Sequence, residues 1–153
     1  MDEKAKKNIL KMIPYGLYVI TTNGNAFSAS WLSQCSFKPP LVMVGSQRES
    51  NSTKMILETK RFAINFVDKS QADIVKHFFK PAHLVGDKLS GYELMISNNI
   101  PILKVSLAYL ECEVRDRLTI GDHTVIIAEI VSATQLREGE PLHLRDTNWS
   151  YSG

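Results

Sequence analysis

The chain has 153 residues, of which 44% are hydrophobic and 22% are charged. These proportions are typical of a globular protein, and the length favours one domain over residues 1–153. The net charge of +2 comes from 18 basic and 16 acidic residues that are dispersed along the chain. A positive charge this small and this dispersed does not indicate a nucleic-acid partner. No apolar stretch is long enough to span a bilayer and the first residues are charged, so we expect a cytoplasmic protein without a membrane partner.

The first third of the chain predicts one helix and three strands. Residues 3–13 place apolar side chains among lysines, which is typical of an amphipathic helix, and Pro14 should end it. Residues 16–22 are rich in β-branched and aromatic side chains and predict a strand. Asn23-Gly24 is a strong tight-turn signal. A strand over 26–37 should return antiparallel, and the next strand is expected just after the Pro-Pro pair.

The middle of the chain predicts two helices around a strand. A short helix is expected over 52–59, and the alternating residues 61–67 predict a strand. The Ser70-x-x-Asp73 pattern has the form of a capping box and should open the second helix. Residues 81–101 are interrupted by glycine and proline, so we expect an irregular loop there, either functional or disordered.

The last third of the chain predicts two long strands. Residues 110–114 alternate apolar with charged side chains, which predicts a strand with one face in water. Gly121-Asp122 is a turn signal, and residues 123–134 are apolar enough for a strand buried on both faces. Six or seven strands with two or three short helices indicate a mainly β (α+β) fold, an antiparallel barrel-like sheet with peripheral helices.

Cysteine and histidine positions argue against a metal site. Cys35 and Cys112 form no C-x-x-C pair, and the four histidines form no closely spaced pair. We therefore expect two free, buried thiols and no bound metal.

A hydroxyl-rich cluster between a strand end and a helix start is a candidate phosphate site. Helix N-termini offer unpaired amide donors and a partial positive charge. Simple N-capping by Ser52 would need no ligand and stays open as an alternative. The candidate residues are Ser46, Arg48, Ser50, Asn51, Ser52 and Thr53.

A segment of small and aromatic residues precedes that cluster. Along an extended strand, Ser28 and Ser30 share one face, while Ala29 and Trp31 lie on the other with Phe27. Small side chains would let a planar ring approach the backbone, although packing of Trp31 in the core explains the pattern equally well. With the hydroxyl cluster, the segment suggests a phosphorylated aromatic cofactor.

His123 is the remaining candidate for chemistry. It follows the Gly121-Asp122 turn, where its side chain could face a cleft or simply be solvated. No nucleophile elbow or evident Ser/His/Asp set suggests hydrolysis.

These pieces together resemble the flavin reductase-like family with an FMN-binding split barrel, and the Ser30-Trp31 version resembles its flavoredoxin-like branch. The resemblance rests on N-A-F-S-A-S-W-L-S-Q-C-S-F-K-P-P-L-V-M-V, R-E-S-N-S-T, R-F-A-I-N-F, H-F-F-K and G-D-H-T-V-I-I-A-E-I, in that order along the chain. It implies a split β-barrel and a non-covalent FMN at a homodimer interface.

The resemblance also implies roles for individual residues. Residues 28–31 (Ser28, Ala29, Ser30 and Trp31) would line the flavin ring, and Ser46, Arg48, Ser52 and Thr53 would hold the phosphate and ribityl chain. Phe79 and Lys80 would border the site. His123 would lie near the flavin or an incoming nicotinamide, and Tyr151 would lie close to the cofactor.

The resulting hypothesis is an FMN-dependent oxidoreductase that takes electrons from NADH or NADPH. Its acceptor would be a flavin, another small molecule or a redox protein. The alternative is an FMN-binding electron-transfer module without NAD(P)H activity. A third hypothesis, a non-flavin barrel that binds another ligand or nucleic acid, is disfavoured by the scattered basic residues.

Overall fold

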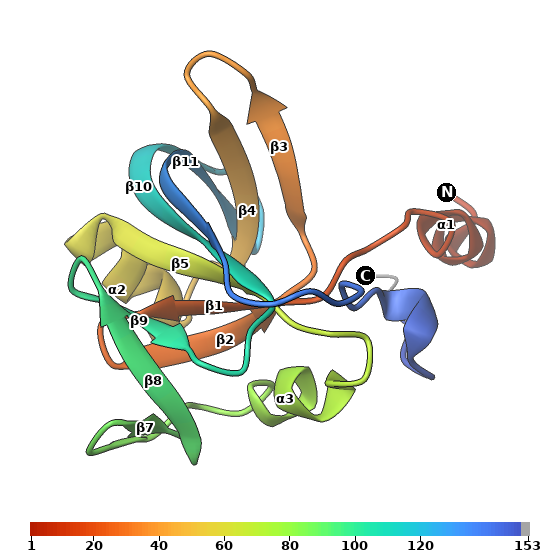
Figure 1. The fold of residues 1–153 in the computed structure, drawn as a ribbon. Helices are drawn as coiled ribbons and strands as arrows, with labels where there is room; N and C mark the ends of the chain where they lie inside the picture. Colours follow the sequence, from red (N-terminus) through yellow and green to blue (C-terminus); the bar gives the residue numbers. More distant parts are fainter. Residues whose placement is uncertain (151–153) are drawn as a thin grey trace.

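The computed structural model describes residues 1–150 and is mainly β, with antiparallel pairing throughout the described sheets (Figure 1). The helices are α1 (Glu3–Leu10), α2 (Asn51–Thr59), α3 (Ala72–His77) and the 3₁₀ helix η1 (Leu144–Asp146). The strands are β1 (Tyr18–Thr22), β2 (Asn25–Ala29), β3 (Leu32–Ser36), β4 (Leu41–Gln47), β5 (Arg61–Phe66), β6 (Leu84–Val85), β7 (Lys88–Leu89), β8 (Tyr92–Ser97), β9 (Ile100–Leu103), β10 (Ala108–Thr119) and β11 (His123–Gln135). Within residues 1–150, no helix is both long and apolar enough to cross a bilayer.

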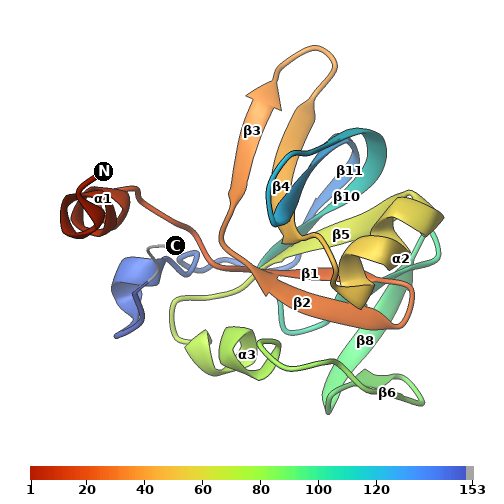
Figure 2. The same cartoon turned by 180° about the vertical axis from the view of Figure 1, so that it is seen from behind.

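Two sheets carry the fold. A seven-stranded sheet has the order β2-β1-β5-β10-β11-β4-β3, and a four-stranded sheet has the order β6-β7-β8-β9. The larger sheet twists so strongly that β3 and β4 run steeply across β1 and β2 (Figures 1 and 2). The small helices lie at its periphery, as the sequence predicts.

The strand expected over 26–37 is in fact two strands, and the single-strand prediction is wrong. β2 pairs with β1, whereas β3 pairs with β4, so the two lie at opposite edges of the large sheet. Between them the chain leaves the β2 ladder at Ser30 and Trp31. The Trp31 carbonyl accepts a hydrogen bond from the Gly45 amide at 2.8 Å, which starts the new pairing.

Residues 84–103 form the smaller sheet, so the expectation of an irregular loop over 81–101 is also wrong. The two glycines that suggest irregularity, together with a serine and two asparagines, are turn residues with positive φ, each lying between one strand and the next. These residues are Gly86, Ser90, Gly91, Asn98 and Asn99.

The helices are present where expected, but two of their predicted caps are wrong. α2 is capped by Ser50, whose hydroxyl accepts the Thr53 amide at 3.1 Å, and not by Ser52. α3 has no side-chain cap: its N-cap is Gln71, one residue after Ser70, and the Ser70 hydroxyl donates to Asp68 Oδ1 at 2.6 Å.

The long hairpin β10–β11 differs from expectation on both strands. Glu111 is fully buried rather than facing water, because Ser97 and Asn98 donate hydrogen bonds to its carboxylate at 2.5 and 2.7 Å. β11 alternates buried and partly exposed residues, so one face remains accessible. Cys112 is buried as predicted, but Cys35 is exposed, and both are free thiols.

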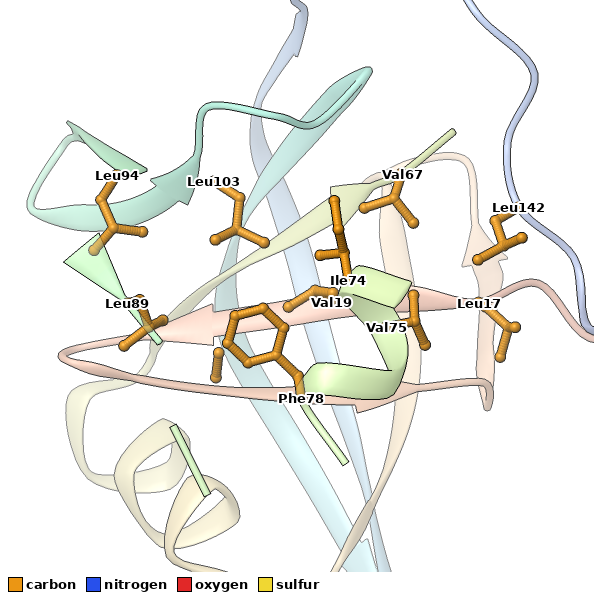
Figure 3. Packing of buried hydrophobic residues seen from close by; sticks show 11 residues of the cluster. Leu17, Val19, Val67, Ile74, Val75, Phe78, Leu89, Leu94, Leu103 and Leu142 are labelled. Atoms are coloured by element: carbon orange, nitrogen blue, oxygen red, sulfur yellow. The ribbon is translucent and has the colours of Figure 1, made fainter. Parts of the chain in front are cut away.

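One hydrophobic cluster fixes α3 against the sheets (Figure 3). Ile74 and Val75 of α3, and Phe78 directly after it, point toward Val19 of β1, with Leu103 of β9 beside them. Burial of Phe78 in this cluster fixes where the helix ends, and the chain that follows it is positioned for the site described next.

Candidate functional site

The main cavity has a volume of about 1120 Å³ and lies where β2, the start of α2 and the end of α3 meet. The His123 end of β11 and the C-terminal segment complete its wall. Eleven residues proposed from the sequence line it: Ser28, Ala29, Ser30, Trp31, Ser46, Ser50, Asn51, Ser52, Phe79, Lys80 and His123.

One wall of the cavity is an aromatic pair. The rings of Trp31 and His123 have centroids 4.5 Å apart and are tilted by 49°. Gly45 makes this arrangement possible, since a Cβ there would lie 2.8 Å from Trp31 Cε3. Trp31 therefore packs on the cavity wall over Gly45, not in the interior of the core.

His123 is oriented by its neighbour in sequence. Its Nδ1 lies 2.8 Å from Oδ1 of Asp122, and a carboxylate can only accept, so Nδ1 carries the proton. In the neutral ring, Nε2 is then left as the acceptor. The hydrogen bond from His123 lowers the pKa of Asp122, and the charge of the histidine adds to the effect.

The start of α2 contributes polar groups to another wall. The Asn51 and Ser52 amides open the helix and have no acceptor within it, and none is found elsewhere in residues 1–150. Both residues line the cavity. An anion placed there would receive backbone donors and the positive end of the helix dipole.

The structure does not bring two predicted phosphate ligands to the cavity. The Thr53 hydroxyl is buried and already donates to the Gln47 carbonyl at 2.7 Å, with Ser46 Oγ at 2.6 Å. Arg48 is exposed, and its Nε lies 3.3 Å from a Glu49 carboxylate oxygen. Neither Thr53 nor Arg48 is among the lining residues. Thr53 instead braces the helix start.

A further wall joins β2 to the end of α3. Ser28 donates its hydroxyl to the Val75 carbonyl at 2.5 Å and its amide to the Phe78 carbonyl at 3.2 Å. Phe79 follows directly and contacts Trp149 edge-on, with ring centroids 5.1 Å apart. The last predicted residue, Tyr151, lies outside the described residues.

Several lining residues escape the sequence prediction. They include Asn25, Gln47, Lys54, Met55 and Trp149. Gln47 lies within the predicted hydroxyl cluster and Lys54 directly follows it, so taking the whole segment 46–54 as candidates would have found both. Trp149 reaches the cavity only through tertiary packing, for which the local sequence gives no signal. Within residues 1–150, no cluster of three or more histidine, cysteine or acidic side chains could hold a metal ion.

Comparison with known proteins identifies the family to which this fold and cavity belong. The flavin reductase like domain model matches residues 10–150. The chain therefore belongs to the flavin reductase-like family.

Two curated relatives are similar to this chain over most of its length. "Diflavin flavoprotein A 1" of Synechocystis sp. is 34% identical over 138 residues, which are 86% of this chain and 24% of the relative. "Probable flavin reductase" of Rhizobium meliloti is 26% identical over 86% of this chain and 43% of its own. The chain thus spans about a quarter of the first curated relative and under half of the second.

A solved structure shares the fold over nearly the whole chain. Nitrilotriacetate monooxygenase component B from Mycobacterium thermoresistibile superposes with a TM-score of 0.79 at 26% identity. The match covers 92% of this chain and 80% of the other.

Proposed function

We propose that the main cavity binds FMN and that the protein is an FMN-dependent NAD(P)H oxidoreductase. The observation that carries the proposal is the pairing of two features in one cavity. The Trp31–His123 wall suits a planar ring, and the open amides of Asn51 and Ser52 suit a phosphate. Membership of the flavin reductase-like family supports this choice of ligand over other phosphorylated aromatics.

The dimensions and chemistry of the cavity fit such a ligand. Its volume of about 1120 Å³ slightly exceeds the roughly 300–1,000 Å³ typical of small-molecule sites, which leaves room for a large ligand. Small residues at Ser28, Ala29 and Ser30 leave the backbone accessible to the edge of a ring. FMN, when bound, supplies the redox chemistry, and the protein supplies binding, orientation and electrostatics.

Protein side chains have distinct tasks in this proposal. Trp31 limits how deeply a ring enters, and Ser28 fixes the β2 edge to the end of α3. His123, with Nδ1 held by Asp122, presents Nε2 as an acceptor for an N–H of the ring or of an incoming amide. Lys54 and Lys80 line the cavity and add positive charge for an anionic cofactor.

We further propose that the twisted seven-stranded sheet is a split barrel and that the chain forms a homodimer. Exposed apolar side chains at α1 and on the β3–β4 and β10–β11 hairpins support an association of two chains; they include Ile9, Met12, Phe37, Leu118 and Ile120.

The oxidoreductase proposal is tested by mixing the FMN-loaded protein anaerobically with NADH and with NADPH in a stopped-flow instrument. We expect the visible absorbance of the oxidised flavin to bleach with at least one nicotinamide. Absence of bleaching with both would overturn the reductase proposal.

A second candidate is an electron-transfer module that binds FMN but does not use NAD(P)H. The observation in its favour is that this chain matches only 24% of a diflavin flavoprotein, so a domain of this kind also occurs within a longer flavoprotein. Bleaching by a reduced redox protein, but by neither nicotinamide, would select this alternative.

A further inference from the structure

A cationic face includes the main cavity and a second hollow beside it. The second hollow has a volume of about 400 Å³ and lies between the residues that follow α1 and the C-terminal segment. The two hollows are continuous, because both are lined by Leu144, Trp149 and Ser150. No aspartate or glutamate among residues 1–150 lines either of them. The cations that line them, here called the basic face, are Lys11, Lys54, Lys80 and Arg145.

Three of these four cations are unpaired in the described part of the chain. The side chains of Lys11, Lys80 and Arg145 are exposed and form no ion pair or hydrogen bond within residues 1–150. The fourth, Lys54, has only a distant carboxylate, with its Nζ 3.9 Å from Glu49. The positive charge of the basic face is therefore available to a partner outside the chain.

Carboxylates in other parts of the surface are already engaged. Asp146 follows Arg145 in sequence, but it accepts the His143 amide at 2.9 Å and lies 3.6 Å from the ring Nδ1 of that histidine. On the long hairpin, Glu129 lies 2.8 Å from Arg115 Nε. Exposed pairs of this kind add little stability, but they cancel the local field. The basic face differs from these regions because its charge is not cancelled.

An exposed aromatic side chain lies within the basic face. Phe79 directly precedes Lys80 and is 59% exposed, although it lines the main cavity and contacts Trp149 edge-on. Protein–protein contact surfaces are enriched in aromatic residues at the centre and are polar at the rim. The basic face thus combines an aromatic anchor with surrounding charge, as a docking surface for another protein requires.

The cations come from four separate parts of the chain. Lys54 lies in α2 and Lys80 follows α3. Lys11 follows α1, and Arg145 lies in η1. Figure 2 shows α1 and α2 on opposite sides of the molecule, with α3 between them. A small anion can neutralise one or two of these charges, whereas the surface of an acidic protein can face all of them.

A second copy of this chain does not suit the basic face. In a two-fold dimer the same surface patch meets itself, so the cations of one chain would approach those of the other. Like charges placed opposite one another repel, which disfavours this pairing. Charge complementarity favours a partner with a negatively charged surface.

We propose that the basic face docks an acidic one-electron carrier protein, which takes up the electrons that NAD(P)H supplies. The inference rests on the proposed function, because that function places a flavin in the main cavity, beneath the docked protein. NADH loses a hydride, which is two electrons and a proton, and each carrier gains one electron at its own redox centre. One NADH and two oxidised carriers therefore give NAD⁺, one proton and two reduced carriers.

The test uses two ferric haem proteins of opposite charge as probes, the acidic cytochrome b5 and the basic cytochrome c. The FMN-loaded full chain is mixed anaerobically with NADH or NADPH and each cytochrome, and haem reduction is followed by absorbance. The variant Lys11→Gln/Arg145→Gln removes two cations of the basic face. The control Lys38→Gln/Arg117→Gln removes the same charge at two positions that line neither hollow. All four positions are exposed, so both variants should keep the wild-type melting temperature.

We expect kcat/KM for cytochrome b5 to fall at least about fivefold in Lys11→Gln/Arg145→Gln and less than about twofold in the control. Raising the salt concentration from about 20 to about 200 mM should lower the wild-type value about tenfold, because screening weakens electrostatic docking. Cytochrome c carries the same sign of charge as the basic face, so its reduction should not slow as salt is added.

Two kinds of result would overturn the proposal. Equal reduction of cytochrome b5 by all three proteins, or a rate that does not depend on salt, would show that the electrons leave on a diffusing small molecule. A raised KM for the nicotinamide or a changed sedimentation coefficient in Lys11→Gln/Arg145→Gln would show that the face serves the co-substrate or a second copy instead.

A calorimetric titration of cytochrome b5 into the FMN-free chain separates this proposal from the proposed function. Binding that weakens about fivefold in Lys11→Gln/Arg145→Gln supports the docking surface, even if neither nicotinamide bleaches the flavin and the reductase proposal fails. Bleaching by a nicotinamide without any binding of cytochrome b5 overturns the docking proposal alone.

Discussion

The polar groups around Asn65 and those around the main cavity are used in opposite ways. Asn65 is fully buried, donates to Val19 O at 3.0 Å and Thr21 Oγ1 at 2.9 Å, and accepts from Leu103 N at 3.0 Å. Ser106 Oγ lies at 3.4 Å. This junction ties β1, β5 and β9 together and leaves nothing for a ligand.

At the cavity, by contrast, the protein leaves hydrogen-bonding capacity unused. The Asn51 and Ser52 amides have no acceptor within residues 1–150, and Nε2 of His123 has no bond in the described structure. A polar group whose bonds are all made within the protein supports the fold, whereas one with spare capacity is available to a ligand. The Thr53 hydroxyl belongs to the first kind, although its sequence position suggests the second.

The largest effect is expected at the Asn65 junction. Asn65→Leu leaves the buried Leu103 amide and Val19 carbonyl without this partner, and each unsatisfied buried group costs about 1–3 kcal/mol. We therefore expect a loss of about 2–5 kcal/mol in the free energy of unfolding, measured by urea denaturation. Asn8→Leu, on the exposed surface of α1, is the matched control. A loss at position 65 no larger than in this control would contradict the structural role of the junction.

A second effect is expected on the free energy of unfolding at high pH, through the buried thiol of Cys112. Burial raises the pKa of the Cys112 thiol from 9.0, the value of an unperturbed thiol, to about 12, with a smaller contribution from the charge of Glu111. The unfolded chain therefore loses this proton before the folded one. Stability from this thiol is complete below about pH 9 and falls as the pH rises toward 12, by up to about 1.4 kcal/mol per pH unit.

The measurement is urea denaturation of the wild type and of Cys112→Ala across this pH window. Tyrosines and lysines titrate in both proteins, so the difference between the two slopes isolates Cys112. A wild-type curve that stays parallel to that of the variant would show that this thiol does not titrate differently on unfolding.

A smaller effect is expected at the main cavity, at Gly45, on which Trp31 packs. In Gly45→Ala, the new Cβ would lie 2.8 Å from Trp31 Cε3 and 3.0 Å from Trp31 Cβ, so the indole must shift. We expect about 1–3 kcal/mol of destabilisation and about tenfold weaker FMN binding, measured by quenching of flavin fluorescence. Gly121→Ala is the control, since nothing lies within 4 Å of its added Cβ. Unchanged FMN affinity in Gly45→Ala would remove Trp31 from the binding wall.

Local sequence signals predict most of the fold here but not its long-range arrangement. The Asn23-Gly24 turn is confirmed, with Gly24 at φ +74°, because the residue type dictates the conformation. The break at Ser30 and Trp31 carries no glycine, proline, asparagine or aspartate, and only pairing of the following strand with β4 reveals it. The smaller sheet is missed because its turn residues resemble those of an irregular loop.

The candidate site shows the same difference between what local sequence predicts and what depends on long-range packing. Segments 28–31 and 50–52 are recognisable because a ring and a phosphate each need a particular local chemistry. Whether a hydroxyl is free depends on partners elsewhere in the fold, as Thr53 demonstrates. Trp149 could not be assigned to the cavity, because it reaches the site through the pairing of the C-terminal segment with residues 15–17.

The central claim, that the open polar groups and the aromatic wall hold a flavin, is tested most directly by titrating FMN into the wild type and Ser30→Trp. Ser30 lines the cavity and is partly exposed, so an indole there fills the ring site without disturbing the core. We predict that the wild type binds FMN stoichiometrically and that Ser30→Trp binds it at least about a hundredfold more weakly with a similar melting temperature. Equal FMN affinity in the two proteins, or no FMN binding by the wild type, would contradict the account.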